Sequence, residues 1–178
     1  MKLPQTIEEL NLNLELSKKE LMDVIKKEAR NLHMQDIMLA TGFLTEDAKY
    51  MPSGYREDYI QRFSKAFFGR IRDLKNDKKE YKGNVDTVKL QGFLKVVGRQ
   101  KEEAHGKNEL CFVKIARIIS LYTTFIREEP VHPVGTRFPG SLVLKYENGR
   151  YLCPVKEKQL ENPSALCRFC VSVQDESV

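Results

Sequence analysis

The apolar run LCFVKIARIISLYTTFI at residues 110–126 constrains the fold more than any other feature of the sequence. It contains many β-branched residues, but it is too long for a single strand. As a helix it would be apolar on most of its faces, and such a helix is buried on several sides. Pro130 and Pro133 stop it. The run therefore predicts a central helix over residues 109–127, surrounded by other elements of the chain.

The first surrounding helix is predicted to begin at Ser17. The residues SKKE form a capping box, in which the Ser17 hydroxyl accepts from the backbone at Glu20 and the Glu20 side chain reaches back to Ser17. Apolar residues then recur at helical spacing, at Leu21, Ile25, Ala29, Leu32, Ile37 and Leu39. The pattern predicts a helix that can continue as far as Gly42.

Two more helices are predicted before the central run. Pro52 and Gly54 break the chain, and an apolar stripe follows at Ile60, Phe63, Phe67, Ile71 and Leu74. The next helix is expected to begin near Asp86, because aspartate commonly caps helix N-termini.

The pattern changes after Pro130. HPVGTRFPG, residues 132–140, has two prolines and two glycines and predicts a loop of defined shape. Asn148-Gly149 suits the type I′ turn of a β-hairpin, which would end at Cys153.

These patterns predict a mainly α protein. A four- to five-helix N-terminal bundle is expected over residues 1–130, and a small β-hairpin and cysteine-bearing module over residues 131–178. A module of about 45 residues buries too little apolar surface to fold alone without a staple. We therefore expect it to pack on the bundle, so that the chain forms one compact unit.

The sequence predicts a cytoplasmic protein without a membrane partner. No apolar run approaches the roughly 20 residues that span a bilayer, and the N-terminal residues lack the zones of a signal peptide. Thiols stay reduced in the cytosol, so we expect the four cysteines to be metal ligands, catalytic groups or core residues rather than disulfides.

Cys153, Cys167 and Cys170 have the spacing C-x13-C-x2-C. A two-residue gap lets two thiolates turn toward one point, and a gap of 13 falls in the range that separates the ligand pairs of many zinc sites. A full zinc ribbon would carry a fourth cysteine near Lys156. The spacing predicts a zinc site with three of its ligands, with an iron–sulfur cluster as the alternative cofactor.

Cys111 and His132 are the two candidates for a fourth ligand. Cys111 shares a face of the central helix with apolar residues, so it is better explained as a core residue. His132 opens the loop that leads to the hairpin. The leading hypothesis is a metal-binding scaffold or binding protein with structural zinc, although four scattered reduced thiols would also explain the pattern.

The HPVGTRFPG loop supplies a second hypothesis, an enzyme or redox protein with an iron–sulfur cluster or an open metal site. Arg137 is a fixed positive donor that could bind a carboxylate or phosphate, with Thr136 beside it. The simpler interpretation is that the prolines and glycines only fix the conformation of the loop that connects the bundle to the hairpin. The sequence carries no GxSxG, HExxH or GxGxxG signature.

Nucleic-acid binding is a third hypothesis. The whole chain has a formal charge of +5, and residues 56–82 hold nine Lys and Arg against five Asp and Glu. Tyr55, Tyr59, Phe67 and Tyr81 lie in or beside this stretch. Phe67 belongs to the apolar stripe, and the five acidic residues reduce the positive electrostatic potential of the stretch. A solvent-exposed helix face is therefore favoured over a nucleic-acid interface.

Three stretches of the C-terminal third, HPVGTRFPG, YLCPVKEKQ and NPSALCRFC, resemble an uncharacterised archaeal family, a domain of unknown function found mainly in methanogens. The resemblance covers most of the chain and is most specific after His132. It implies an archaeal cytoplasmic protein and brings no activity or site residue with it. It also raises the expectation of an iron–sulfur cluster, because anaerobic methanogens use clusters heavily, while the cysteine spacing still favours zinc.

Overall fold

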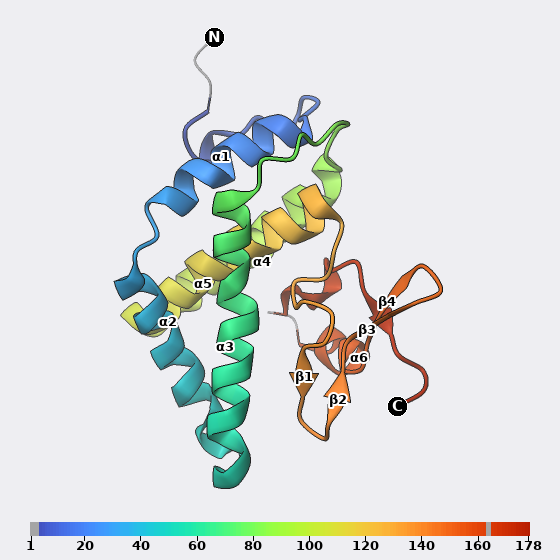
Figure 1. The fold of residues 1–178 in the computed structure, drawn as a ribbon. Coiled ribbons are helices and arrows are strands. Elements are labelled where there is room, and N and C mark those ends of the chain that lie inside the picture. Colours follow the sequence, from blue (N-terminus) through green and yellow to red (C-terminus); the bar gives the residue numbers. More distant parts are fainter. Residues whose placement is uncertain (1–3, 163–164) are drawn as a thin grey trace.

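The predicted central helix lies across the middle of the helical part in the computed structural model, which describes residues 4–162 and 165–178. Figure 1 shows α3 crossing in front of α5, with α1 above and α2 at one side. The helices are α1 (Lys18–Arg30), α2 (Met34–Asp47), α3 (Ser53–Asn76), α4 (Thr87–Glu103) and α5 (Lys107–Ser120), with short 3-10 turns at Ile7–Glu9 and Ala48–Tyr50. The mainly α fold class is confirmed, and we call these five helices the bundle.

Two helix starts follow the capping residues that the sequence contains. The Ser17 hydroxyl accepts from the Glu20 amide at 3.1 Å, and the Glu20 carboxylate accepts from the Ser17 amide at 2.9 Å. Asp86 begins α4 by accepting from the Lys89 amide at 2.9 Å. Local hydrogen bonding therefore fixes both boundaries where the sequence predicts them.

The expected continuous helix from Ser17 to Gly42 is wrong. The first helix ends at Arg30, and α2 begins after His33, whose amide donates to the Asp36 carboxylate at 2.8 Å. Gly42 lies inside α2 because α5 passes close by, and a Cβ there would approach the Asn108 side chain to 3.0 Å. An unrecognised helix start and a close helix–helix contact explain the difference.

The core of the bundle gathers around α4 and α5. Its largest fully buried side chains include Tyr122, Phe93, Leu90, Ile115 and Ile118. After Ser120 the central helix continues as a π-helix, Leu121–Arg127, and ends at Glu128 in the left-handed conformation, with φ 55°. The sequence pattern located this helix but gave no sign of its wider winding.

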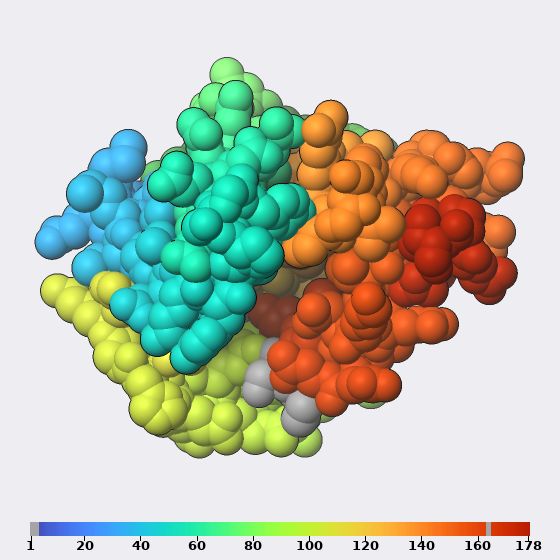
Figure 2. All heavy atoms as spheres, turned by 90° about the horizontal axis from the view of Figure 1, so that it is seen from below, coloured from blue at the N-terminus to red at the C-terminus, as the bar shows by residue number. Residues whose placement is uncertain are grey.

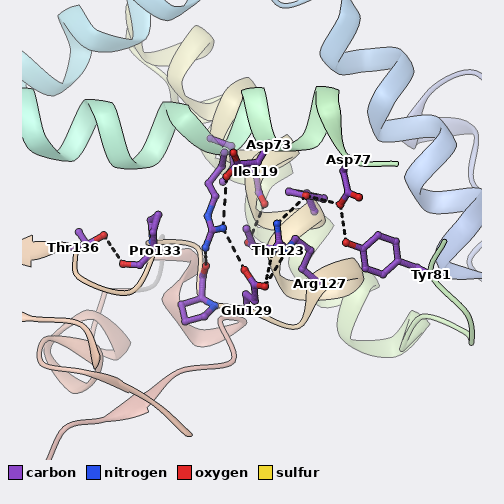
Figure 3. A network of polar contacts seen from close by, with 12 residues as sticks. Asp73, Asp77, Tyr81, Ile119, Thr123, Arg127, Glu129, Pro133 and Thr136 are labelled. Atoms are coloured by element: carbon purple, nitrogen blue, oxygen red, sulfur yellow. Dashed lines mark hydrogen bonds and ion pairs between the residues drawn. The ribbon is translucent and has the colours of Figure 1, made fainter. Parts of the chain in front are cut away.

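A polar network fastens the π-helix to α3 (Figure 3). Asp77 accepts from the hydroxyls of Tyr81 and Tyr122, each at 2.7 Å. Arg127 pairs with Glu129 at 2.7 Å. Buried Arg70 contacts Glu129 at 3.3 Å. These contacts fix the point at which the chain leaves the bundle.

The C-terminal segment, residues 131–178, forms two small sheets (Figure 1). β1 (Arg137–Phe138) pairs antiparallel with β2 (Leu142–Val143). β3 (Lys145–Glu147) and β4 (Arg150–Cys153) form the predicted hairpin, with positive φ at Asn148 and Gly149. After α6 (Lys156–Leu160) and a 3-10 turn at Leu166–Arg168, β5 (Val173–Gln174) pairs parallel with β4.

Across residues 4–162 and 165–178, no helix is long and apolar enough to cross a membrane.

Candidate functional site

A pocket of about 370 Å³ lies between the bundle and the C-terminal segment. Figure 2 shows this hollow between α3, α5 and the orange and red residues that follow them. Its lining comes from α2, α3, α4 and α5 on one side and from residues 131–172 on the other. It therefore joins parts of the chain that are far apart in sequence.

The return of the chain into β5 brings three cysteines to this pocket. Cys153 ends β4 and pairs with Gln174 of β5, so the intervening segment must fold back beside it. That segment carries Cys167 and Cys170, and all three cysteines line the pocket. The Cys170 thiol also lies 3.2 Å from the Ser172 hydroxyl.

Burial favours the protonated forms of the Cys153 and Cys167 thiols. Burial, followed by the nearby thiols of Cys170 and Cys153, raises the pKa of Cys167 to about 11. Burial is also the main cause that raises the pKa of Cys153. The Lys156 ammonium acts in the opposite direction on both thiols. Any ligand that needs thiolates must therefore displace protons.

Lys156 is a buried cation at the same pocket, with only 9% of its surface exposed. Its ammonium donates to the carbonyl oxygens of Cys167 and Cys170, the latter at 2.9 Å. Among the described residues no carboxylate lies within ion-pair distance of it. The sequence analysis noticed Lys156 only as the place of a missing cysteine, and its short surrounding motif gave no signal of burial.

His132 also lines the pocket and lies among three phenylalanine rings. Its ring centroid is 5.1 Å from Phe63, 6.1 Å from Phe67 and 5.4 Å from Phe138. Burial, with a smaller contribution from the Arg70 charge, lowers the pKa of His132 to about 4. The imidazole is therefore neutral at pH 7, which is the form that binds metals.

The other predicted site residues lie elsewhere. Cys111 is half-buried on α5, outside the pocket lining, with its thiol 3.9 Å from an Asp36 carboxylate oxygen. Thr136 is buried and donates its hydroxyl to the Pro133 carbonyl at 2.6 Å, which shapes the turn. Arg137 is exposed and lines a different pocket beside Tyr59.

The arrangement of the potential ligand side chains bears on the predicted metal site. Within residues 4–162 and 165–178, no group of three or more His, Cys, Asp or Glu side chains is arranged to hold a metal ion. Cys153, Cys167 and Cys170 nevertheless line one pocket.

The basic stretch at residues 56–82 is mostly the helix α3. Phe67 is buried and belongs to the core, and Arg70 is buried beside Glu129. Arg62 pairs with Asp58 one turn away at 2.7 Å. Several of its charges and rings thus have partners inside the protein.

Comparison with known proteins agrees with the resemblance found in the C-terminal stretches. The family described as "Uncharacterized protein conserved in archaea (DUF2115)" matches residues 17–175. A UPF0305 protein of Methanothermobacter thermautotrophicus is 50% identical over 163 residues, covering 92% of this chain and 99% of that protein. A UPF0305 protein of Methanocaldococcus jannaschii is 34% identical over 156 residues, covering 86% and 93%. No solved structure matches significantly.

Proposed function

This chain belongs to the archaeal DUF2115 family, and we propose that it is a metal-binding protein in which Cys153, Cys167 and Cys170 hold one zinc ion. The observation that carries the proposal is that three thiols from two segments, the end of β4 and the turn at Leu166–Arg168 with the residues after it, line one pocket beside a buried cation. Zinc prefers thiolate and imidazole ligands, and sites of this composition are common among structural zinc sites.

The charges at the pocket support this choice. Three thiolates around one Zn²⁺ would carry a net charge of −1, and the Lys156 ammonium would offset it. A buried cation without a carboxylate partner is costly, so an anionic group beside it is favourable. Lys156 already favours the thiolate forms of Cys153 and Cys167.

His132 is a better fourth ligand than Cys111. Both were open alternatives from the sequence, but only His132 lines the pocket that contains the cysteines. Its ring is also kept neutral by its surroundings. A water molecule in the fourth position is the other arrangement that three protein ligands allow.

Metal at this point would act as a staple. It would tie the end of β4 to the turn at Leu166–Arg168, and both to the start of the C-terminal segment at His132, whose ring packs against Phe63 of α3. The function would then be that of a scaffold or binding protein, in which the ion supplies folding free energy to a segment with a small core.

The test is purification without oxygen, elemental analysis and titration with Co²⁺, whose thiolate bands report the ligands. We expect about one zinc per chain, and Cys170→Ser should weaken Co²⁺ binding at least about tenfold. Cys111→Ser is the matched control, because that thiol lies outside the pocket. It should bind like the wild-type protein.

Absence of bound metal together with absence of a cobalt band would refute the proposal. Equal effects of Cys170→Ser and Cys111→Ser would refute the ligand assignment. Iron with sulfide and a brown colour would replace zinc by an iron–sulfur cluster and point to redox chemistry.

A further inference from the structure

Part of the lining of the same pocket is a row of aromatic rings. Ring centroids follow one another at 5.0 Å from Phe43 to Phe112, 5.8 Å from Phe112 to Phe67 and 5.5 Å from Phe67 to Phe63. His132 continues the row at 5.1 Å from Phe63. All five rings line the pocket, so the row presents a continuous aromatic surface.

A buried hydroxyl interrupts this apolar lining. Ser120 is 2% exposed and lines the pocket, and its Oγ has no hydrogen-bond partner within the described parts of the chain. One turn onward, Thr123 donates its hydroxyl back to the Ile119 carbonyl at 3.0 Å (Figure 3). Ser120 makes no such bond, although a buried hydroxyl normally finds a partner. Its hydroxyl thus lacks an acceptor among the described residues, and an acceptor on a bound molecule would supply one.

The size and polarity of the pocket limit what could occupy it. Small-molecule pockets are about 300–1,000 Å³, so about 370 Å³ suits a compact molecule and not a peptide. The phenylalanine rings favour a flat body with an aromatic face. One acceptor atom on that body would satisfy Ser120.

We infer that this pocket binds a planar aromatic small molecule that carries a carbonyl or similar acceptor, which receives a hydrogen bond from Ser120. The ring system stacks against Phe63, Phe67 and Phe112, and the acceptor points to α5. The inference uses the aromatic row and Ser120, and it does not depend on metal at the cysteines.

Prodan, a neutral naphthalene with a propionyl carbonyl, is the probe. Its emission shifts to the blue and brightens in an apolar site, and the chain contains no tryptophan that would interfere. We expect saturable binding of one prodan per chain. Ala116→Leu, at a buried residue of the lining, should fill the space and abolish it.

Ser120→Ala tests the hydrogen bond, and Ser64→Ala is its matched control. Ser64 also has a buried hydroxyl without a partner in the described residues, but it lies outside this pocket. Ser120→Ala should weaken prodan binding about fivefold to tenfold without lowering the thermal midpoint, whereas Ser64→Ala should leave binding unchanged.

Lack of saturable binding by the wild-type protein, or equal affinity in Ser120→Ala and Ser64→Ala, would overturn the inference. Cys170→Ser separates this inference from the zinc proposal. It should lose cobalt binding and retain prodan binding, so that either proposal can fail while the other stands.

Discussion

In the bundle most buried side chains belong to one large apolar cluster, whereas the described residues of the C-terminal segment form a second, small buried cluster of Phe138, Leu144 and Cys153. The two parts differ at one buried charge, Lys156, although buried Asp175 of the C-terminal segment has an ionic partner in Lys145 at 3.4 Å. In the bundle Arg70 meets Glu129, and Arg117 meets Glu28 at 2.6 Å. In the C-terminal segment Lys156 meets only backbone carbonyls among the described residues.

The comparison indicates that apolar burial and paired charges stabilise the bundle by themselves. The C-terminal segment has too small a core for that and depends on contacts with the bundle and on polar contacts at its cysteines. One such contact is Phe169, which lies between Cys167 and Cys170 and packs edge-on against Phe93 of α4 at 5.5 Å.

The largest effect should come from Phe93→Ala. Phe93 is fully buried and also contacts Phe125 at 5.7 Å, so its removal leaves a cavity at the centre of the bundle. We expect the free energy of unfolding to fall by about 3–5 kcal/mol, measured by urea denaturation. Val88→Ala on the same helix is 78% exposed and should change it by less than about 0.5 kcal/mol. A similar loss in both would show that α4 is not central to the core.

The contact between the C-terminal segment and the bundle at His132 can be tested through the pH dependence of the free energy of unfolding. The folded pKa of His132 is about 4, whereas an unfolded histidine titrates near about 6.5. From pH 7 to pH 4 the unfolded chain takes up a proton that the folded chain does not, so the fold loses about 3 kcal/mol from this group. Above pH 7 the group has no effect.

The variant His132→Phe should remove that part of the pH dependence, measured by urea denaturation at a series of pH values. His105→Phe is the control, because that ring is exposed. Parallel curves for His132→Phe and the wild-type protein would contradict the lowered pKa of the half-buried His132.

Leu144→Ala deletes the centre of the small cluster, where Leu144 is 1% exposed. We expect a loss of about 2–3 kcal/mol. Hydrogen exchange should rise at residues 131–178 before it rises in α4 and α5, because the bundle core remains intact. Equal acceleration in both parts would show that the chain unfolds as one unit and would remove the predicted boundary at residue 130.

The sequence predicted those features that depend on local chemistry. The capping residues Ser17 and Asp86 and the turn at Asn148-Gly149 define their own conformations, so they could be identified without the fold. The break between α1 and α2 was missed because Asp36 caps the second helix from inside an apolar pattern.

The candidate site was predictable only in part. Cysteine spacing singled out three residues that line one pocket, and their role as metal ligands stays a prediction. The burial of Lys156 and the free hydroxyl of Ser120 depend on segments that are distant in sequence, and neither leaves a periodic or motif signal. The wide winding of residues 121–127 is likewise set by its tertiary partners, Asp77 among them.

The substitution Asp77→Asn is expected to have the smallest effect on the free energy of unfolding. It tests how much a paired carboxylate contributes to the stability of the bundle. Partial burial alone would raise the pKa of Asp77, but hydrogen bonds from Tyr122 and Tyr81 outweigh this and lower it. The carboxylate therefore stabilises the fold above about pH 4, and this contribution is lost as the pH falls through the lower folded pKa. Because the group is partly exposed, we expect Asp77→Asn to cost about 1 kcal/mol at pH 7 and nothing near pH 2.

Asp58→Asn is the matched control for this substitution. It removes an exposed carboxylate from the same helix, where Asp58 pairs with Arg62 at the surface, and should cost less than about 0.5 kcal/mol. Urea denaturation of both variants at pH 7 and pH 2 gives the comparison. If Asp77→Asn were as mild as Asp58→Asn, the network around the π-helix would add little to the bundle. Apolar packing would then be the main difference between the bundle and the C-terminal segment.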